Sequence, residues 1–185
     1  MDFELSEEQK DIQKAAREFA QGEFDPDLAL ELDQNRSFPE AIWKKAARLG
    51  FIGIHYPEEF GGQGLSLLEN VLVTEAFCRG DSGIGSALSI VDLGSELILK
   101  FGSEQQMKRF LPPLVKGEEK LTVAFGESED DKDLSHISTT VEKREKGYLL
   151  RGLKRFVLNA PLADSFIILC KESVEGWLTL FVEKD

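Results

Sequence analysis

The sequence is poor in residues that bind metals or form disulfides. Only two cysteines and two histidines occur among its 185 residues. Cys78 and Cys170 lie far apart in apolar surroundings, which favours free thiols in a reducing compartment, the cytoplasm, over a disulfide. His55 and His136 have no partner at metal-ligand spacing, so the sequence predicts no metal site.

Long apolar runs and an excess of positive charge are also missing. No apolar run approaches the roughly 20 residues of a membrane span, and residues 1–8 do not resemble a secretory signal. The chain has 22 basic and 34 acidic side chains, a formal net charge of −12. Nucleic acid and anionic membranes would be repelled, which argues against both as partners. The composition, 42% hydrophobic and 30% charged, is otherwise typical of a globular protein with a buried core.

The first 115 residues carry helical patterns. Three capping boxes, in which a serine and a later Glu or Gln satisfy each other's backbone, predict helix starts at Ser6, Ser66 and Ser103. A further helix is expected from Pro39 to Gly50, and an apolar stripe of helical period continues over residues 81–101. These signals predict a bundle of five or six helices.

Gly61, Gly62 and Gly64 interrupt the helical patterns and require a tight backbone. Read alone, they would suit a phosphate-binding loop. No Lys-Ser/Thr follows them, however, and the strand-turn-helix fingerprint of a dinucleotide site is missing. A structural turn between helices is the favoured interpretation.

The pattern changes to strands after residue 120. An apolar run opens at Leu121, a hairpin is expected around Lys146-Gly147, and further strands are predicted at 154–158, 165–170 and 177–182. The sequence thus predicts an α+β chain, with an all-α helical domain over residues 1–120 and an antiparallel β-domain over 121–185. Near the junction, five of the seven residues from Glu127 to Asp133 are acidic, and this loop is a natural place for a functional site.

Several stretches, in order, closely resemble the acyl-CoA dehydrogenases. Those that resemble the family's N-terminal helical domain are Leu49–Ile54, Pro57–Ser66, Glu75 with Arg79–Ser82, Phe101–Gln106 and Leu111–Leu114, and those that resemble its middle β-domain are Gly147–Lys154 and Ala163-Asp164. The resemblance implies an FAD-dependent oxidoreductase that converts an acyl-CoA thioester to its 2,3-enoyl form. In the family a glutamate base removes the α-proton, and FAD takes a hydride from the β-carbon.

The resemblance also implies what this sequence does not contain. The chain ends at Asp185, in what resembles only the first part of the middle domain. The β-domain is therefore expected to be incomplete and the C-terminal helical domain, with the glutamate base, absent. No residue of this sequence is assigned a catalytic role. Asp92 is the nearest candidate for a substrate contact, because the corresponding helix lines the family's acyl pocket; the alternative is an ordinary carboxylate at a helix edge.

The family positions for cofactor binding correspond here to Phe125, Gly126, Lys132, Phe156 and Leu158. Gly126 stands where the family has a hydroxyl that contacts the flavin, and Leu158 where a hydroxyl bonds to flavin N5. Lys132 replaces a serine at the phosphate end, and an acidic run, Glu129–Asp131, replaces small residues. Each lost hydrogen bond costs roughly 1–3 kcal/mol, so weak or absent FAD binding by this chain alone is expected.

Three interpretations remain open at this level. The chain is one subunit of a heteromeric acyl-CoA dehydrogenase, a non-catalytic structural or interaction protein, or a piece of a longer chain. An incomplete sheet leaves an open strand edge, so self-association or a partner subunit that supplies the missing strands and helices is expected.

Overall fold

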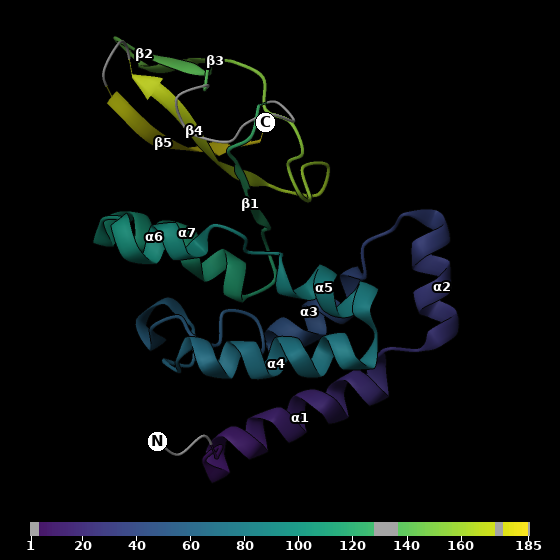
Figure 1. The fold of residues 1–185 in the computed structure, drawn as a ribbon. Coiled ribbons are helices and arrows are strands. Elements are labelled where there is room, and N and C mark those ends of the chain that lie inside the picture. Colours follow the sequence, from purple (N-terminus) through teal and green to yellow (C-terminus); the bar gives the residue numbers. More distant parts are fainter. Residues whose placement is uncertain (1–3, 128–136, 173–175, 185) are drawn as a thin grey trace. The chain divides into compact units, whose positions relative to one another are not determined.

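A computed structural model describes residues 4–127, 137–172 and 176–184 (Figure 1). The chain divides into two compact units, Met1–Glu119 (the helical unit) and Lys120–Asp185 (the β unit). Among the described residues, no helix has both the length and the apolar character needed to cross a membrane.

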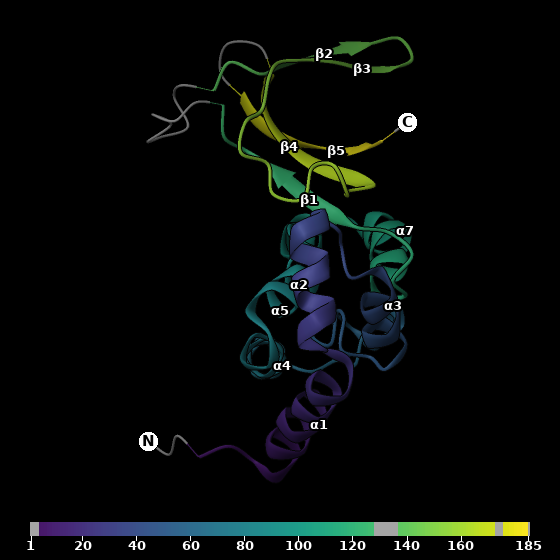
Figure 2. The ribbon, with the colours of Figure 1, turned by 90° about the vertical axis from the view of Figure 1, so that its right-hand side faces the viewer.

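The described part of the helical unit contains seven α-helices and one short 3-10 helix. They are α1 (Glu7–Glu23), α2 (Pro26–Asn35), α3 (Glu40–Arg48), η1 (Glu58–Phe60), α4 (Leu67–Gly80), α5 (Ser82–Ser89), α6 (Ser95–Phe101) and α7 (Glu104–Val115). α1 and α5 both pack against α4 (Figures 1 and 2). The three predicted capping boxes are all present, at Ser6, Ser66 and Ser103.

The helix count exceeds the prediction for two local reasons. A separate helix, α2, follows α1, with Pro26 in its first turn and the Asp25 side chain accepting hydrogen bonds from Asp27 N and Leu28 N. The continuous stripe over 81–101 is divided into α5 and α6, because Gly94 has a φ of 109° that a helix cannot contain.

Aromatic side chains form the centre of the helical core. They are Phe19 and Phe24 from the α1 region, Phe51 from the loop after α3, and Phe77 from α4, and five pairs among them have ring centroids 5.4 to 6.0 Å apart. Their mutual orientations are tilted or edge-to-face, and each such contact is worth about 0.5–1.5 kcal/mol beyond burial. The cluster joins α1, α4 and that loop.

The glycine-rich segment is explained by local geometry. Gly61 and Gly64 have φ values of 94° and 65°, in the left-handed region that favours glycine. A Cβ atom at Gly62 would lie 2.1 Å from the carbonyl oxygen of Tyr56, so no other residue fits there without backbone movement. These requirements support the structural interpretation of the turn.

A buried carboxylate links α1 to the start of α4. Glu69 Oε2 accepts from Ser66 N at 2.8 Å and also from Ser66 Oγ, and its Oε1 accepts from Gln9 Nε2 at 2.8 Å. The hydrogen bonds from Ser66, followed by that from Gln9, lower the pKa of Glu69 to about 2. Because this folded-state value lies below the ordinary one, Glu69 stabilises the helical unit above about pH 4.5, and this contribution is lost as the pH falls toward 2.

Replacing Glu69 by glutamine is expected to destabilise the helical unit by about 1 kcal/mol at pH 7, since a charge-assisted cap becomes a neutral one. The variant should also lose less stability than the parent chain between pH 5 and pH 3, as followed by urea unfolding at each pH. Glu75→Gln is the matched control, because Glu75 lies on the same helix in an exposed pair with Arg79. Equal acid sensitivity in the Glu69 variant and the parent chain would contradict this account.

The β unit is a mixed sheet built around one central strand. Its strands are β1 (Leu121–Ala124), β2 (Thr140–Arg144), β3 (Gly147–Arg151), β4 (Ser165–Glu172) and β5 (Gly176–Glu183). β4 pairs with β5 in antiparallel fashion and with β1 and β2 in parallel fashion, and β2 and β3 form the predicted hairpin. The α+β class and the hairpin are confirmed, but the sheet is mixed where an antiparallel one was expected. Parallel pairs need long connections, and residues 125–164 between β1 and β4 supply one.

The strand predicted at 154–158 does not form. Phe156 has a φ of 55°, and Asn159, just beyond, has a φ of 56°, both in the left-handed region and incompatible with an extended strand. The segment is instead an irregular loop, and most of its side chains are exposed.

Candidate functional site

Two loops of the β unit bring predicted cofactor positions together. Arg155 N donates a 2.9 Å hydrogen bond to the carbonyl oxygen of Gly126, so the loop that leaves β1, Phe125–Glu127 (the exit loop), lies beside the segment 154–158. Thr122 Oγ1 donates to the carbonyl oxygen of Leu158 at 2.7 Å, which fixes the far end of that segment to β1. Lys132 and the acidic run Glu129–Asp131 lie outside the described residues.

The two loops present apolar side chains to the surface. Phe156 is 72% exposed and Leu158 57% exposed, with Phe125 at 37% and Leu153 at 63%. Exposed side chains of this size in neighbouring loops are typical of interaction or ligand surfaces. The left-handed backbone at Phe156 costs of order 1–3 kcal/mol and persists only where the surroundings enforce it, as is common at ligand sites.

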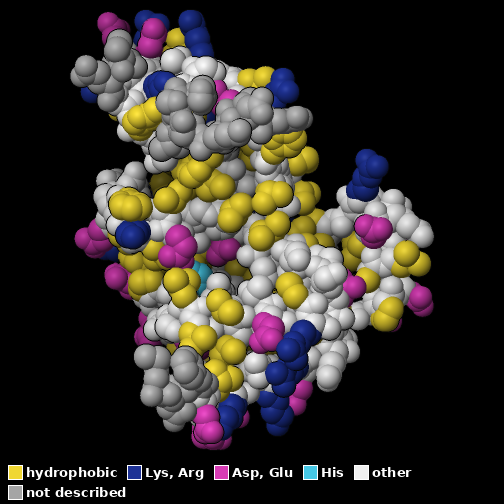
Figure 3. Space-filling view, in the orientation of Figure 1, with side chains coloured by type: hydrophobic (Ala, Val, Ile, Leu, Met, Phe, Trp, Pro, Cys, Tyr) yellow, Lys and Arg dark blue, Asp and Glu magenta, His cyan; other side chains and the backbone are white. Residues whose placement is uncertain are grey.

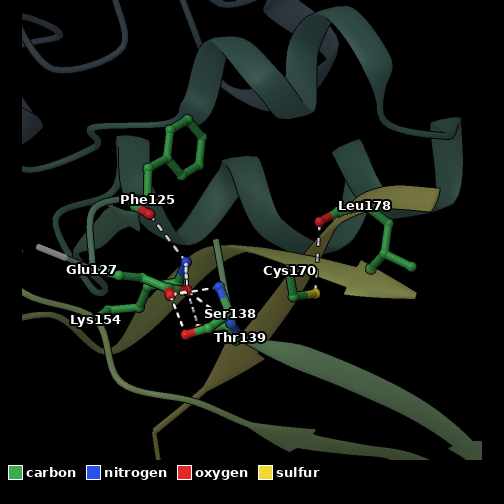
Figure 4. Close-up of polar contacts among 7 residues, drawn as sticks. All are labelled: Phe125, Glu127, Ser138, Thr139, Lys154, Cys170 and Leu178. Carbon is green, nitrogen blue, oxygen red and sulfur yellow. Dashed lines mark hydrogen bonds and ion pairs between the residues drawn. The ribbon is translucent and has the colours of Figure 1, made fainter. Parts of the chain in front are cut away.

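A buried ion pair lies beneath these loops (Figure 4). Lys154 Nζ lies 2.9 Å from Glu127 Oε1 and 3.0 Å from the carbonyl oxygen of Phe125, and the two charged side chains are only 9% and 8% exposed. Glu127 also accepts from both the backbone N–H and the hydroxyl of Ser138 and of Thr139. All three segments, 125–127, 138–139 and 154–155, are therefore joined by one carboxylate and one ammonium group.

The charge state of Glu127 follows from these contacts. Burial raises the pKa of this carboxyl group, but the hydrogen bonds from Lys154, Ser138 and Thr139 outweigh burial and hold the pKa well below its ordinary range. Glu127 is thus an anion at neutral pH. Neither member of the pair was predicted from the sequence, because Glu127 was counted with the acidic loop 127–133 and Lys154 with the strand expected at 154–158.

Asp92 lies in the helical unit, between α5 and α6. Its Oδ2 accepts a hydrogen bond from the hydroxyl of the fully buried Tyr56, and Nε2 of the neighbouring His55 lies 2.6 Å from Glu96 Oε1. Burial raises the pKa of Asp92, although the Tyr56 hydrogen bond and the nearby His55 oppose that rise. The same burial, together with the Asp92 charge, raises the pKa of Tyr56 well above its usual value.

A small cavity of about 20 Å³ lies beside this aspartate, which is room for about one water molecule. Asp92, Ser89, Asn70 and Thr74 provide the polar part of its lining. The hydrogen bond from the Tyr56 hydroxyl to Asp92 joins the loop at Tyr56 to the segment that leads into α6. The role of Asp92 as a substrate contact stays a prediction.

The described residues contain no group of three His, Cys, Asp or Glu side chains that could hold a metal. Cys78 and Cys170 are free thiols, and burial raises the pKa of Cys170. Acidic side chains are spread over the face seen in Figure 3 and do not gather in one patch, as in an ordinary solvated surface.

The helical unit also matches a known family model. The model for the acyl-CoA dehydrogenase N-terminal domain matches residues 6–118. The chain belongs to the acyl-CoA dehydrogenase family. Benzylmalonyl-CoA dehydrogenase from Aromatoleum aromaticum is 34% identical over 187 aligned positions, which cover 100% of this chain and 49% of that protein.

Two further relatives carry information about cofactor and assembly. The solved FAD complex of PigA matches 100% of this chain and 50% of its own, with a TM-score of 0.88 and 34% identity. The caffeyl-CoA reductase-Etf complex subunit CarC from Acetobacterium woodii is 36% identical over 169 residues, 90% of this chain and 44% of that protein. This chain spans about half the length of the relatives it matches.

As a member of an acyl-CoA dehydrogenase family with an FAD-bound relative, the chain can be tested for its fit to a flavin. Phe156 and Leu158 offer an apolar surface suited to the face of a ring system. Neither Gly126 nor Leu158 carries a side-chain donor for the polar edge of the ring. At these three positions the chain therefore offers an apolar face and no side-chain hydrogen-bond donor.

Proposed function

We propose that this chain supplies the helical domain and the first part of the β-domain of an acyl-CoA dehydrogenase, which oxidises an acyl-CoA thioester to its enoyl form once the rest of the fold is present. The family match over residues 6–118 carries this proposal. The continuation of the match into the β unit supports it, since relatives align with nearly the whole chain. In this family the redox chemistry belongs to FAD, and the protein contributes positioning and electrostatics.

Within that enzyme, the two loops of the β unit would form part of the flavin surface. Phe156 and Leu158 would pack on the ring, with Phe125 and Gly126 beside them. Gly126 and Leu158 would contribute no side-chain hydrogen bond. The glutamate base and the remaining cofactor contacts would come from the second half of the fold, carried either by a continuation of this chain or by a partner subunit.

A second function, that of a non-catalytic structural or interaction subunit, is favoured by one observation. Gly126 and Leu158, which lack a side-chain donor, lie on two loops that the hydrogen bond from Arg155 N to the carbonyl oxygen of Gly126 joins. In a heteromeric enzyme this chain would be a non-catalytic subunit of an active acyl-CoA dehydrogenase, which combines the two functions. A relative named as a subunit of a reductase complex supports a heteromeric assembly. The cytoplasmic location and the self-association or partner expected from the sequence stay predictions.

The function is tested by assembling this chain with the second half of the fold and adding a panel of short, branched and long acyl-CoA thioesters. We expect bound flavin to lose its visible absorbance on addition of at least one thioester, with the enoyl-CoA as product. The chain alone should show neither the loss of flavin absorbance nor the enoyl-CoA product. A complete, flavin-loaded assembly that no acyl-CoA reduces would contradict the catalytic proposal and favour the structural one.

A further inference from the structure

We propose that the buried Glu127–Lys154 pair is a positioning clamp, which fixes the exit loop against the segment 154–158 and so presents Phe156 to a planar ring ligand. The clamp rests on the proposed function, because the ring it would serve is the flavin. It assigns positioning roles to two residues that contact each other and the loops around them.

The carboxylate of Glu127 organises one side of the clamp. Four donors from two consecutive residues, Ser138 and Thr139, point to its oxygens, and each residue gives both its N–H and its hydroxyl. Charge-assisted bonds of this kind are shorter and stronger than neutral ones. The exit loop is thereby fixed to the backbone that leads into β2.

The ammonium group of Lys154 organises the other side. It bonds to the carboxylate of Glu127 and also to the main-chain oxygen of Phe125, so it restrains the exit loop at both ends. The next residue, Arg155, donates its N–H to Gly126, between those two contacts. Close approach extends to Gly152, where a Cβ atom would lie 2.2 Å from Thr139 Oγ1.

The clamp ends directly before the strained residue. Phe156 follows Arg155 and has a φ of 55° with 72% of its surface exposed. A non-glycine residue keeps such a conformation only when its neighbours enforce it. A loop fixed before the ligand arrives loses less freedom on binding, which is how positioning residues raise affinity.

The clamp is tested first in this chain without a ligand. The double variant Glu127→Gln with Lys154→Met keeps the side-chain volumes and leaves no buried charge without its partner, so the β unit should still fold. Hydrogen exchange of the Arg155 amide, which donates to Gly126, is expected to accelerate at least tenfold, while amides of β4 such as Ile167 keep their protection. The matched control is Glu142→Gln with Arg144→Met, which removes an exposed ion pair of the same unit and should leave exchange at Arg155 unchanged.

Equal acceleration in β4 and at Arg155 would show a general loss of stability, and unchanged exchange at Arg155 would show that the pair holds nothing in place. Either result overturns the proposal. In the complete assembly, the double variant should raise the Kd for FAD at least tenfold, and an unchanged Kd would also overturn it. If the parent assembly binds no FAD, the proposed function fails, and the exchange experiment alone decides whether the clamp exists.

Discussion

Replacing Lys154 alone by methionine is expected to destabilise the β unit by about 3–5 kcal/mol at pH 7, the usual cost of leaving one buried charge without its partner. The variant keeps Glu127 ionised beneath the loops, where it is 8% exposed, and removes both the nearest positive charge and the contact to Phe125. Urea unfolding followed by the amide signals of β4 measures the loss directly.

The pH dependence gives this prediction a second readout. Because the folded-state pKa of Glu127 lies well below the unfolded value, this carboxylate stabilises the parent chain above about pH 4.5 and less as the pH falls. Without Lys154 the folded-state pKa rises, and protonation then relieves the uncompensated charge. The gap in stability between the variant and the parent chain should therefore narrow on acidification.

The control for this prediction is Arg144→Met, which removes an exposed charge from β2 in the same unit. It should cost less than about 1 kcal/mol, as is usual for surface pairs. The role given to the ion pair would be contradicted if Lys154→Met cost no more stability at pH 7 than Arg144→Met. It would also be contradicted if the difference in stability between the Lys154 variant and the parent chain widened in acid.

The second prediction concerns flavin retention. The chain alone is expected to purify colourless, and the double variant Gly126→Thr with Leu158→Thr should strengthen FAD binding tenfold or more, but only in the complete assembly. The two threonines would restore two hydrogen bonds to FAD, each worth roughly 1–3 kcal/mol of binding free energy. About 1.4 kcal/mol corresponds to a factor of ten in Kd. Neutralising the acidic run Glu129–Asp131 should add to the gain, because extra carboxylates near a pyrophosphate oppose its charge.

The structure permits both substitutions. Among the residues that the structure describes, a Cβ atom at Gly126 would meet only the carbonyl oxygen of Arg155, at 3.5 Å, an ordinary contact. The Leu158 side chain is 57% exposed, and the bond from Thr122 goes to its main-chain oxygen, so a threonine leaves that bond in place. Leu153→Thr, at a similarly exposed position of the same loop as Leu158, is the matched control and should leave FAD binding unchanged. An equal gain in this control would show that general polarity, and not the restored donors, is responsible.

The sequence predicted the helical unit better than the β unit, for physical reasons. Capping boxes and apolar stripes are local signals, and the helices that follow Ser6, Ser66 and Ser103 begin where these residues predict. The pairing of β4 with β1 and β2 depends on residues far apart in the chain, which no local pattern encodes. The alternation at 154–158 resembled a strand, and only tertiary contacts force the left-handed backbone at Phe156.

For the candidate site, too, the contacts between residues far apart in the chain were not predicted from the sequence. Only the family resemblance assigned Gly126 and Leu158 to a flavin site, and that assignment stays a prediction. The segment that contains Leu158 was expected to be a strand and is a loop. The sequence could not predict the ion pair below these loops, because burial turns an apparently solvated Glu127 into the partner of Lys154. Asp92 was recognised as a carboxylate near the edge of an apolar face, but its hydrogen bond to Tyr56 depends on the fold.

A titration with FAD, followed by flavin fluorescence, tests the central claim most directly. It compares the unmodified chain alone with the same chain joined to the second half of the acyl-CoA dehydrogenase fold. The account predicts no saturable binding by the chain alone in the physiological range, and measurable FAD binding by the complete assembly, strengthened by Gly126→Thr with Leu158→Thr. Tight, stoichiometric binding of FAD by the unmodified chain alone would contradict it.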